Sequence, residues 1–242
     1  VNCPGNPGAW KRHAVYHKKV KKQWQASEDG GVHQQRNREI AEEAARRAAL
    51  SGDEYDALLA EGSRYLCKED TRRSARTLRE AIALRPDRPE AYLNLAGALT
   101  NSAHVMEAAQ RYLEAKERFP VGSENEASAT AAAFNMLSRK ECAEVAKPEW
   151  WNDEELTALS SRVVRAAPNE AIAYEMRAVV LGGLGGDLWE SSPRSAAELR
   201  EAATHFERAA ALTSAPAGKA NLAAGAEQCR RLADAMSGPA GA

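Results

Sequence analysis

Cysteine and histidine are the residues of this sequence best suited to bind a metal or to act as a nucleophile and its base. The four cysteines lie far apart and none belongs to a C-x-x-C pair, so they form neither a disulfide framework nor a complete zinc site. We expect the last three to be reduced, half-buried packing residues. No Ser-His-Asp, Cys-His or paired-carboxylate arrangement stands out, and three histidines are isolated, so the sequence predicts a protein that is not an enzyme. The residues concerned are Cys3, Cys67, Cys142, Cys229, His33, His104 and His205.

The segment GAWKRHAVYHKK, residues 8–19, differs from the rest of the chain in being basic and aromatic, with two histidines four residues apart. Residues 1–25 contain six Lys and Arg residues and no acidic residue. Because the formal net charge of the 242-residue chain is −1, the remainder carries −7. A basic end suits nucleic acid or an acidic partner, although a charge run on one short segment is more often a solvated helix face.

This segment resembles the end of a MYND-type zinc finger, which runs roughly C-Q-x3-W-x2-H-x3-C and is followed by basic residues. Trp10-x2-His13 stands in register, and His17 replaces the final cysteine at the x3 spacing. Cys3 lies seven residues before Trp10, where the family has five. The resemblance implies that Cys3, His13 and His17 are ligands of a structural zinc ion.

A closed structural zinc site needs four ligands, so three candidates predict that this chain alone does not hold zinc tightly. Zinc is an expected cofactor only if further ligands precede residue 1, and otherwise none is expected. Because that residue is valine, we expect the chain to be a fragment or a processed form. The alternative interpretation of residues 1–25 is a basic amphipathic helix with Trp10, Val20 and Trp24 on or near one face.

The middle of the chain repeats itself with a period of 34 residues. Pro86 and Pro120 are 34 positions apart, and stepping back from each proline gives residue pairs with the same separation. Large residues three and four apart predict one apolar face for each helix, and small residues let two helices cross closely. The matched pairs are Leu58 with Tyr92, Gly62 with Ala96, Tyr65 with Leu99, Ser74 with Ala108, Leu78 with Tyr112, and Ala81 with Ala115.

These residues resemble the tetratricopeptide (TPR) repeat, whose pattern is W-x2-L-G-x2-Y, then A-x3-F, then A and P. The resemblance implies an all-α fold, an α-solenoid of helix-turn-helix units, of which the last two are degenerate and lengthened by insertions. We expect a linker and leading helix in residues 26–54, and a C-terminal capping helix and disordered tail in residues 215–242. The units are residues 55–88, 89–122, 123–170 and 171–214.

The ends of the helices and the two insertions carry further signals. Asp53 and Asn152 are expected to cap helices. Trp150 and Trp151 precede the second of these caps, and packing onto that helix is favoured over an exposed binding role. The sequence GGLGGDLW, residues 182–189, is expected to be a flexible linker whose large residues pack against the last repeat. Those residues are Leu184, Leu188 and Trp189.

Proteins with TPR repeats bind peptides or other proteins and do no chemistry, so the resemblance implies a non-catalytic adaptor or scaffold that holds a protein or peptide partner in a concave groove. Some family members clamp a terminal carboxylate with Lys, Asn and Arg at set positions, but only Asn94 matches here. We therefore interpret Asn94 as lining the groove or making an inter-helix hydrogen bond. The implied partner-binding residues are Leu59, Ser63, Cys67, Leu93, Asn94, Gly97, Asn101, Glu175 and Val179.

Two alternative functions remain open at this point. One is a nucleic-acid-associated protein that uses the basic segment, and the other is a fragment of a SET/MYND-type methyltransferase, although nothing here resembles the SET core. No apolar run approaches the roughly 20 residues that a membrane-spanning helix needs, and no leader peptide is visible. We expect a cytoplasmic protein, with the nucleus as the alternative, that binds no membrane.

Overall fold

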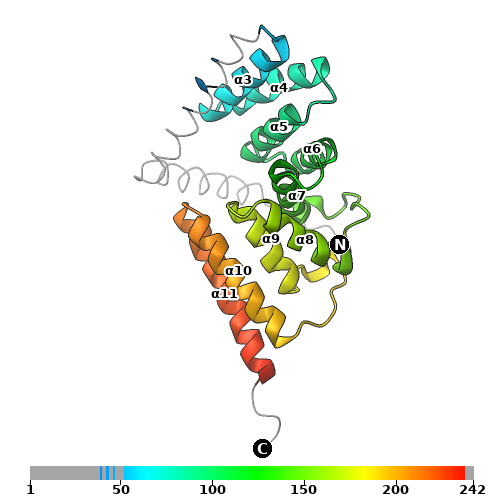
Figure 1. Ribbon diagram of the computed structural model, residues 1–242, viewed down its shortest axis with the longest axis vertical. Coiled ribbons are helices and arrows are strands. Elements are labelled where there is room, and N and C mark those ends of the chain that lie inside the picture. Colours follow the sequence, from blue (N-terminus) through cyan, green and yellow to red (C-terminus); the bar gives the residue numbers. More distant parts are fainter. Residues whose placement is uncertain (1–38, 40–41, 44–45, 47–51, 238–242) are drawn as a thin grey trace, which may run out of the picture.

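The computed structural model describes residues 39, 42, 43, 46 and 52–237 of the chain. Within residues 52–237 every regular element is a helix, and Figure 1 shows the helices stacked in chain order along the long axis, from α3 (Glu54–Cys67) and α4 (Thr71–Leu84) at one end to α11 (Pro216–Ser237) at the other. Each helix packs against the next one along the chain. This all-α, solenoid-like arrangement confirms the fold class expected from the sequence. None of the described helices is long and apolar enough to cross a membrane.

The helices follow one another as hairpin pairs, and the length of the connection within a pair varies. The first two pairs, α3–α4 and α5–α6, are closed by short turns at residues 68–70 and 102–104. Residues 138–152 and 182–195 separate the helices of the next two pairs, and we call these segments the first and second insertion. The other elements are α5 (Pro89–Asn101), α6 (Val105–Arg118), α7 (Glu124–Leu137), α8 (Asp153–Ala166), α9 (Ala171–Leu181), α10 (Ala196–Leu212) and the short 3-10 helices η1 (Lys140–Cys142) and η2 (Gly186–Leu188).

Side-chain oxygens at the helix starts accept the backbone N–H groups that have no partner within the helix. Asp53 caps α3 by accepting a hydrogen bond of 2.8 Å from the backbone N–H of Tyr55. Asn152 caps α8 by accepting one of 3.0 Å from the N–H of Glu155. Both caps confirm the prediction made from the sequence. Ser195 forms a reciprocal capping box at the start of α10.

The two helices of the first pair cross closely at Gly62. The hydroxyl of Ser74 donates a hydrogen bond of 2.8 Å to the carbonyl oxygen of Gly62, and both residues are buried. A Cβ atom at Gly62 would lie 2.6 Å from Cγ of Leu78, which is itself fully buried. The small residue at this repeat position is therefore required by the helix crossing.

Replacing Gly62 with alanine is expected to destabilise the first helix pair. Overpacking costs about 1–3 kcal/mol, and alanine recovers about 1 kcal/mol of helix propensity, which leaves a net loss. The midpoint of urea unfolding measures it. Gly97→Ala is the matched control, because a Cβ at Gly97 meets Leu66 at an ordinary 3.7 Å. If Gly62→Ala were as stable as Gly97→Ala, the proposed close crossing would be wrong.

A recurring contact closes the turn that precedes three first helices. The hydroxyl of Tyr92 donates to the carbonyl oxygen of Pro86 at 3.0 Å, and the hydroxyl of Tyr174 donates to that of Pro168 at 3.1 Å. In both cases the side chain follows the proline by six residues. Glu126 stands six residues after the proline of the intervening turn and accepts a hydrogen bond of 3.3 Å from the N–H of Gly122. The same position therefore fixes the turn in three successive units.

The two insertions meet in an aromatic cluster. The ring of Trp151, which is only 8% exposed, lies 5.3 Å from the ring of Phe134 and 5.9 Å from that of Trp189, measured between centroids. The indole N–H of Trp151 donates to the carbonyl oxygen of Leu188 at 2.9 Å. An exposed binding role for Trp151 is therefore excluded by its burial. Of the large residues of the second insertion, Leu184 packs with the α9–α11 core, whereas Leu188 and Trp189 join the larger core, which extends from α4 to one side of α9.

A buried ion pair links the same two insertions. The carboxylate of Asp153 binds both terminal nitrogens of Arg194, and the distance from Nη1 to Oδ2 is 3.0 Å. Only 15% of the Asp153 side chain and 9% of the Arg194 side chain are exposed. Burial alone would raise the pKa of Asp153, but the hydrogen bonds from Arg194 and the N–H of Ser192 outweigh it and hold the pKa below its usual value. The second insertion is therefore fixed to the start of α8.

Candidate functional site

The residues expected to bind a partner lie on the first helices of three pairs. We call them the first-helix face: Leu59, Ser63 and Cys67 on α3; Leu93, Asn94, Gly97 and Asn101 on α5; and Glu175 and Val179 on α9. Asn101 is exposed and the other eight are partly exposed. Helices pack through their buried stripes and leave this side in contact with solvent. The face is therefore open to a partner along most of its length.

The structure brings the α3 and α5 parts of this face into direct contact. The amide Nδ2 of Asn94 donates a hydrogen bond of 3.0 Å to the hydroxyl of Ser63, which in turn donates to the carbonyl oxygen of Leu59 at 2.8 Å. Asn94 thus makes the inter-helix hydrogen bond considered for it from the sequence. Its amide is held in one orientation beside Gly97, so this part of the face is pre-organised.

The third unit contributes residues that sequence reasoning missed. Helix α7 lies between α5 and α9, since the hydroxyl of Thr100 contacts the sulfur of Met136 at 3.7 Å and α7 packs against α9. Counting 34 residues on from Asn94 and Asn101 reaches Ser128 and Asn135, and both are partly exposed on α7. The same period that identified the first two units could have found them, but the insertion after α7 obscured it.

Helix α7 also narrows the face in the middle. The residues 34 positions after Leu93 and Gly97 are Ala127 and Ala131, which are 1% and 0% exposed. Small side chains at these positions let neighbouring helices cover α7 from almost every direction. The α9 part of the first-helix face is therefore separated from the α5 part by a helix that offers only a few side chains.

Glu175 is the charged member of the first-helix face. Burial raises the pKa of this carboxyl above its usual value, and Arg139 beyond the end of α7 lowers it in part. Within the described part of the chain, no hydrogen bond or ion pair is made to its carboxylate. Ile172 and Val179, one turn before and one turn after, are partly buried against the core. A half-buried carboxylate thus stands between two apolar side chains.

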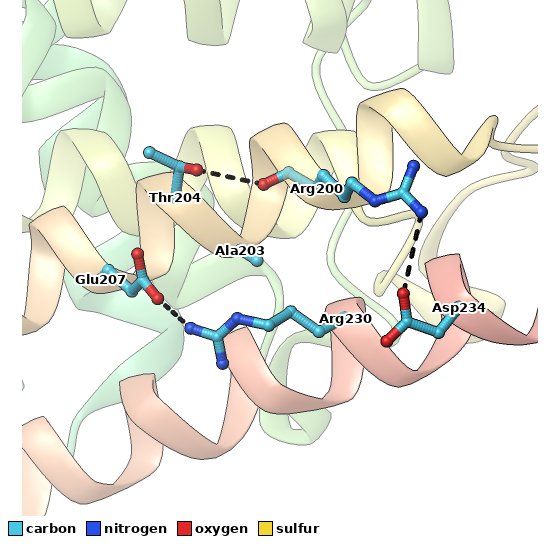
Figure 2. Close-up of a pocket in the computed structure, with 6 residues that line it drawn as sticks. All are labelled: Arg200, Ala203, Thr204, Glu207, Arg230 and Asp234. Carbon is cyan, nitrogen blue, oxygen red and sulfur yellow. Dashed lines mark hydrogen bonds and ion pairs between the residues drawn. The ribbon is translucent and has the colours of Figure 1, made fainter. Parts of the chain in front are cut away.

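A separate cavity of about 260 Å³ lies between α10 and α11 and is shown in Figure 2. Arg230 pairs with Glu207, and Arg200 lies 3.7 Å from Asp234. The hydroxyl of Thr204 donates to the backbone carbonyl of Arg200 at 3.2 Å. Because two cations and two anions neutralise each other across the cavity, it offers no net charge to a ligand. The arrangement binds α11 to α10.

The described residues contain little reactive chemistry. Burial raises the pKa of the Cys142 and Cys229 thiols, which keeps them protonated and unreactive. The hydroxyl of Ser102 lies 3.0 Å from Nδ1 of His104 but donates its proton to the carbonyl oxygen of Ala98, so this pair is not an activated nucleophile. Within residues 39, 42, 43, 46 and 52–237, no three metal-ligating side chains cluster.

The three zinc ligands implied by the sequence lie outside the described residues, so they stay a prediction. They are Cys3, His13 and His17. The remaining candidate is the first-helix face, which comprises stacked helices with mixed polar and apolar side chains and one half-buried carboxylate. A comparison of the sequence with protein-family models and with curated proteins finds no match.

Proposed function

We propose that this chain is a non-catalytic adaptor of the TPR type, which binds an extended peptide or a short helix of another protein on the first-helix face. Two observations support the repeat assignment. The 34-residue period of the sequence coincides with the helix pairs α3–α4 and α5–α6, and the residue six positions after the proline hydrogen-bonds to the turn in three units, at Tyr92, Glu126 and Tyr174. Stacked pairs of this kind present one long surface to a partner.

The observation that carries the proposal is that the first helices are held in contact with one another, the α3 and α5 parts of the face directly and the α9 part through α7. Ser63 and Asn94 join α3 to α5, Thr100 and Met136 join α5 to α7, and α7 packs on α9. A surface held in shape by the core loses little conformational freedom when a partner binds. Apolar contacts from Leu59 and polar ones from its neighbours suit a peptide that offers both kinds of group.

Gly97→Gln tests this proposal without disturbing the fold. Gly97 lies in the middle of α5, and a Cβ there makes only an ordinary contact of 3.7 Å with Leu66. Replacing a helix glycine should raise stability by up to about 1 kcal/mol. The new side chain occupies the first-helix face, so we expect peptide affinity to fall about tenfold or more, which corresponds to at least about 1.4 kcal/mol.

The measurement starts from random peptides displayed on phage and selected on the full chain at physiological salt. Fluorescence anisotropy then gives the dissociation constants for the wild type and for Gly97→Gln. Ala83→Gln, an exposed substitution on the second helix α4, is the matched control and should bind as the wild type does. If Gly97→Gln bound the selected peptides as tightly as Ala83→Gln does, the first-helix face would not be the binding surface.

A further inference from the structure

Glu175 occupies a position where a charge is costly. The residue lies in the interior of α9, its neighbours Ile172 and Val179 pack against the core, and its carboxylate receives no hydrogen bond within the described part of the chain. Removing a carboxylate from water without a partner is unfavourable, which is why burial raises its pKa. Glutamine has the same shape and would remove this cost, so the charge does not serve the fold.

Arg139 is the cation that lowers the pKa of Glu175, but it does not remove the cost of burying the carboxylate. Arg139 acts on the Glu175 carboxylate through space and lowers its pKa in part, but the two side chains form no ion pair. Arg139 is exposed beyond the last residue of α7 and remains solvated there. The carboxylate is therefore left with unused capacity to accept hydrogen bonds, on the side of α9 that belongs to the first-helix face.

We propose that Glu175 recognises a lysine or arginine side chain of the peptide that binds on the first-helix face. This inference rests on the proposed function. The N–H groups of such a side chain would donate charge-assisted hydrogen bonds to the carboxylate oxygens of Glu175, which have no other donor in the described part of the chain. The methylene groups of a lysine or arginine side chain pack well on apolar surface, and Ile172 and Val179 supply it on either side of Glu175.

The charge of the chain favours the same partner. Residues 26–242 carry a net charge of −7, so they attract a basic peptide rather than an acidic one. The unit that contains Glu175 offers no cation at the positions where a carboxylate-clamping repeat would need one. Ile172 and the buried Met176 stand there instead. The selectivity expected at this end of the face is therefore for positive side chains over terminal carboxylates.

Glu175→Gln should make the protein more stable at pH 7. The pKa of Glu175 is higher in the folded chain than the usual 4.5 of the unfolded chain. As the pH rises above 4.5, the unfolded chain therefore loses this proton first, and the charge that must then be buried on folding lowers the stability of the wild type. The variant should unfold at a higher urea concentration than the wild type at neutral pH, and the difference should vanish well below pH 4.5. Glu170→Gln, an exposed substitution just before α9, should show no such pH-dependent gain.

The binding experiment uses the peptides selected on the wild-type chain. We expect them to share a lysine or arginine whose replacement by acetyl-lysine or citrulline weakens binding about ten- to hundredfold, the range expected for a charged hydrogen bond. Glu175→Gln should show the same weakening for the unmodified peptide and no further loss for the modified one. Glu170→Gln should bind both peptides as the wild type does.

The contrary outcomes separate this inference from the proposed function. If the selected peptides bind wild type and Glu175→Gln equally, the first-helix face binds peptides but the role of Glu175 is wrong. If peptides are selected only after the six Lys and Arg residues of residues 1–25 are replaced by glutamine, the chain's own basic segment occupies this site in the wild type, and the inference that Glu175 recognises a separate peptide there is wrong. If neither the folded wild-type chain nor the chain with the six replaced Lys and Arg residues selects a peptide, the proposed function itself is wrong.

Discussion

Replacing Arg194 with methionine is expected to destabilise the chain by about 3–5 kcal/mol, because it leaves the buried carboxylate of Asp153 without its counter-ion. The two side chains are only 9% and 15% exposed, so water replaces the lost partner only in part. Arg194 also donates to the carbonyl oxygen of Val180 at 3.0 Å, and that bond is lost as well. Urea unfolding followed by circular dichroism at pH 7 measures the change.

The pH dependence of stability gives a second readout of the same ion pair. The pKa of Asp153 is lowered in the fold, so its contribution is present above pH 3.8 and disappears as the pH falls through the lowered pKa. Arg194→Met should therefore lose its disadvantage at strongly acidic pH. The double variant Asp153→Asn with Arg194→Met should recover part of the loss at neutral pH, because no buried charge remains unpaired.

A surface ion pair of the same residue types serves as the control. Arg200 lies 3.7 Å from Asp234, and the two side chains are 53% and 77% exposed. Arg200→Met should cost no more than about 1 kcal/mol, because exposed pairs are solvated and screened. If Arg194→Met were as mild as Arg200→Met, the link between the second insertion and α8 would contribute nothing to stability.

The sequence predicted the stacking of helices well because the information is local. Large residues at Tyr92 and Leu95, a small one at Ala96 and a proline at the end of the pair fix one unit, and the 34-residue period repeats it. The contacts between insertions could not be predicted in this way. Asp153 and Arg194 are 41 residues apart, and no periodic pattern marks either as the partner of the other.

The candidate site was predictable to a similar degree. The register of the repeat placed Ser63 and Asn94 on first helices, where the structure shows their hydrogen bond. The register also predicted that Glu175 lies on the first-helix face. The burial of its carboxylate could not be predicted, because it depends on how α9 packs with its neighbours and not on the residue types along α9. The near-complete burial of α7 was missed for the same reason, because alanine occurs on exposed and buried helix faces alike.

Trp151→Ala should have an effect as large as that of the ion pair, at about 3–5 kcal/mol. The side chain packs against Phe134 and Trp189, and its indole N–H satisfies the carbonyl oxygen of Leu188. Truncation removes the ring from the centre of the cluster, leaves a cavity, and leaves that carbonyl without its donor. Trp150→Ala is the matched control, because Trp150 is only partly buried and should cost less.

The distribution of this loss along the chain is as informative as its size. In a stack of helix pairs each unit is stabilised mainly by its neighbours, so the damage from Trp151→Ala should be greatest where the insertions join α7 to α9. Hydrogen exchange should then show reduced protection from residue 138 to residue 195 and nearly unchanged protection in α3 and α4. Such a variant would keep the Ser63–Asn94 part of the first-helix face while loosening the part that contains Glu175. Uniform loss of protection along residues 52–237 would instead mean that the helices unfold as one cooperative unit.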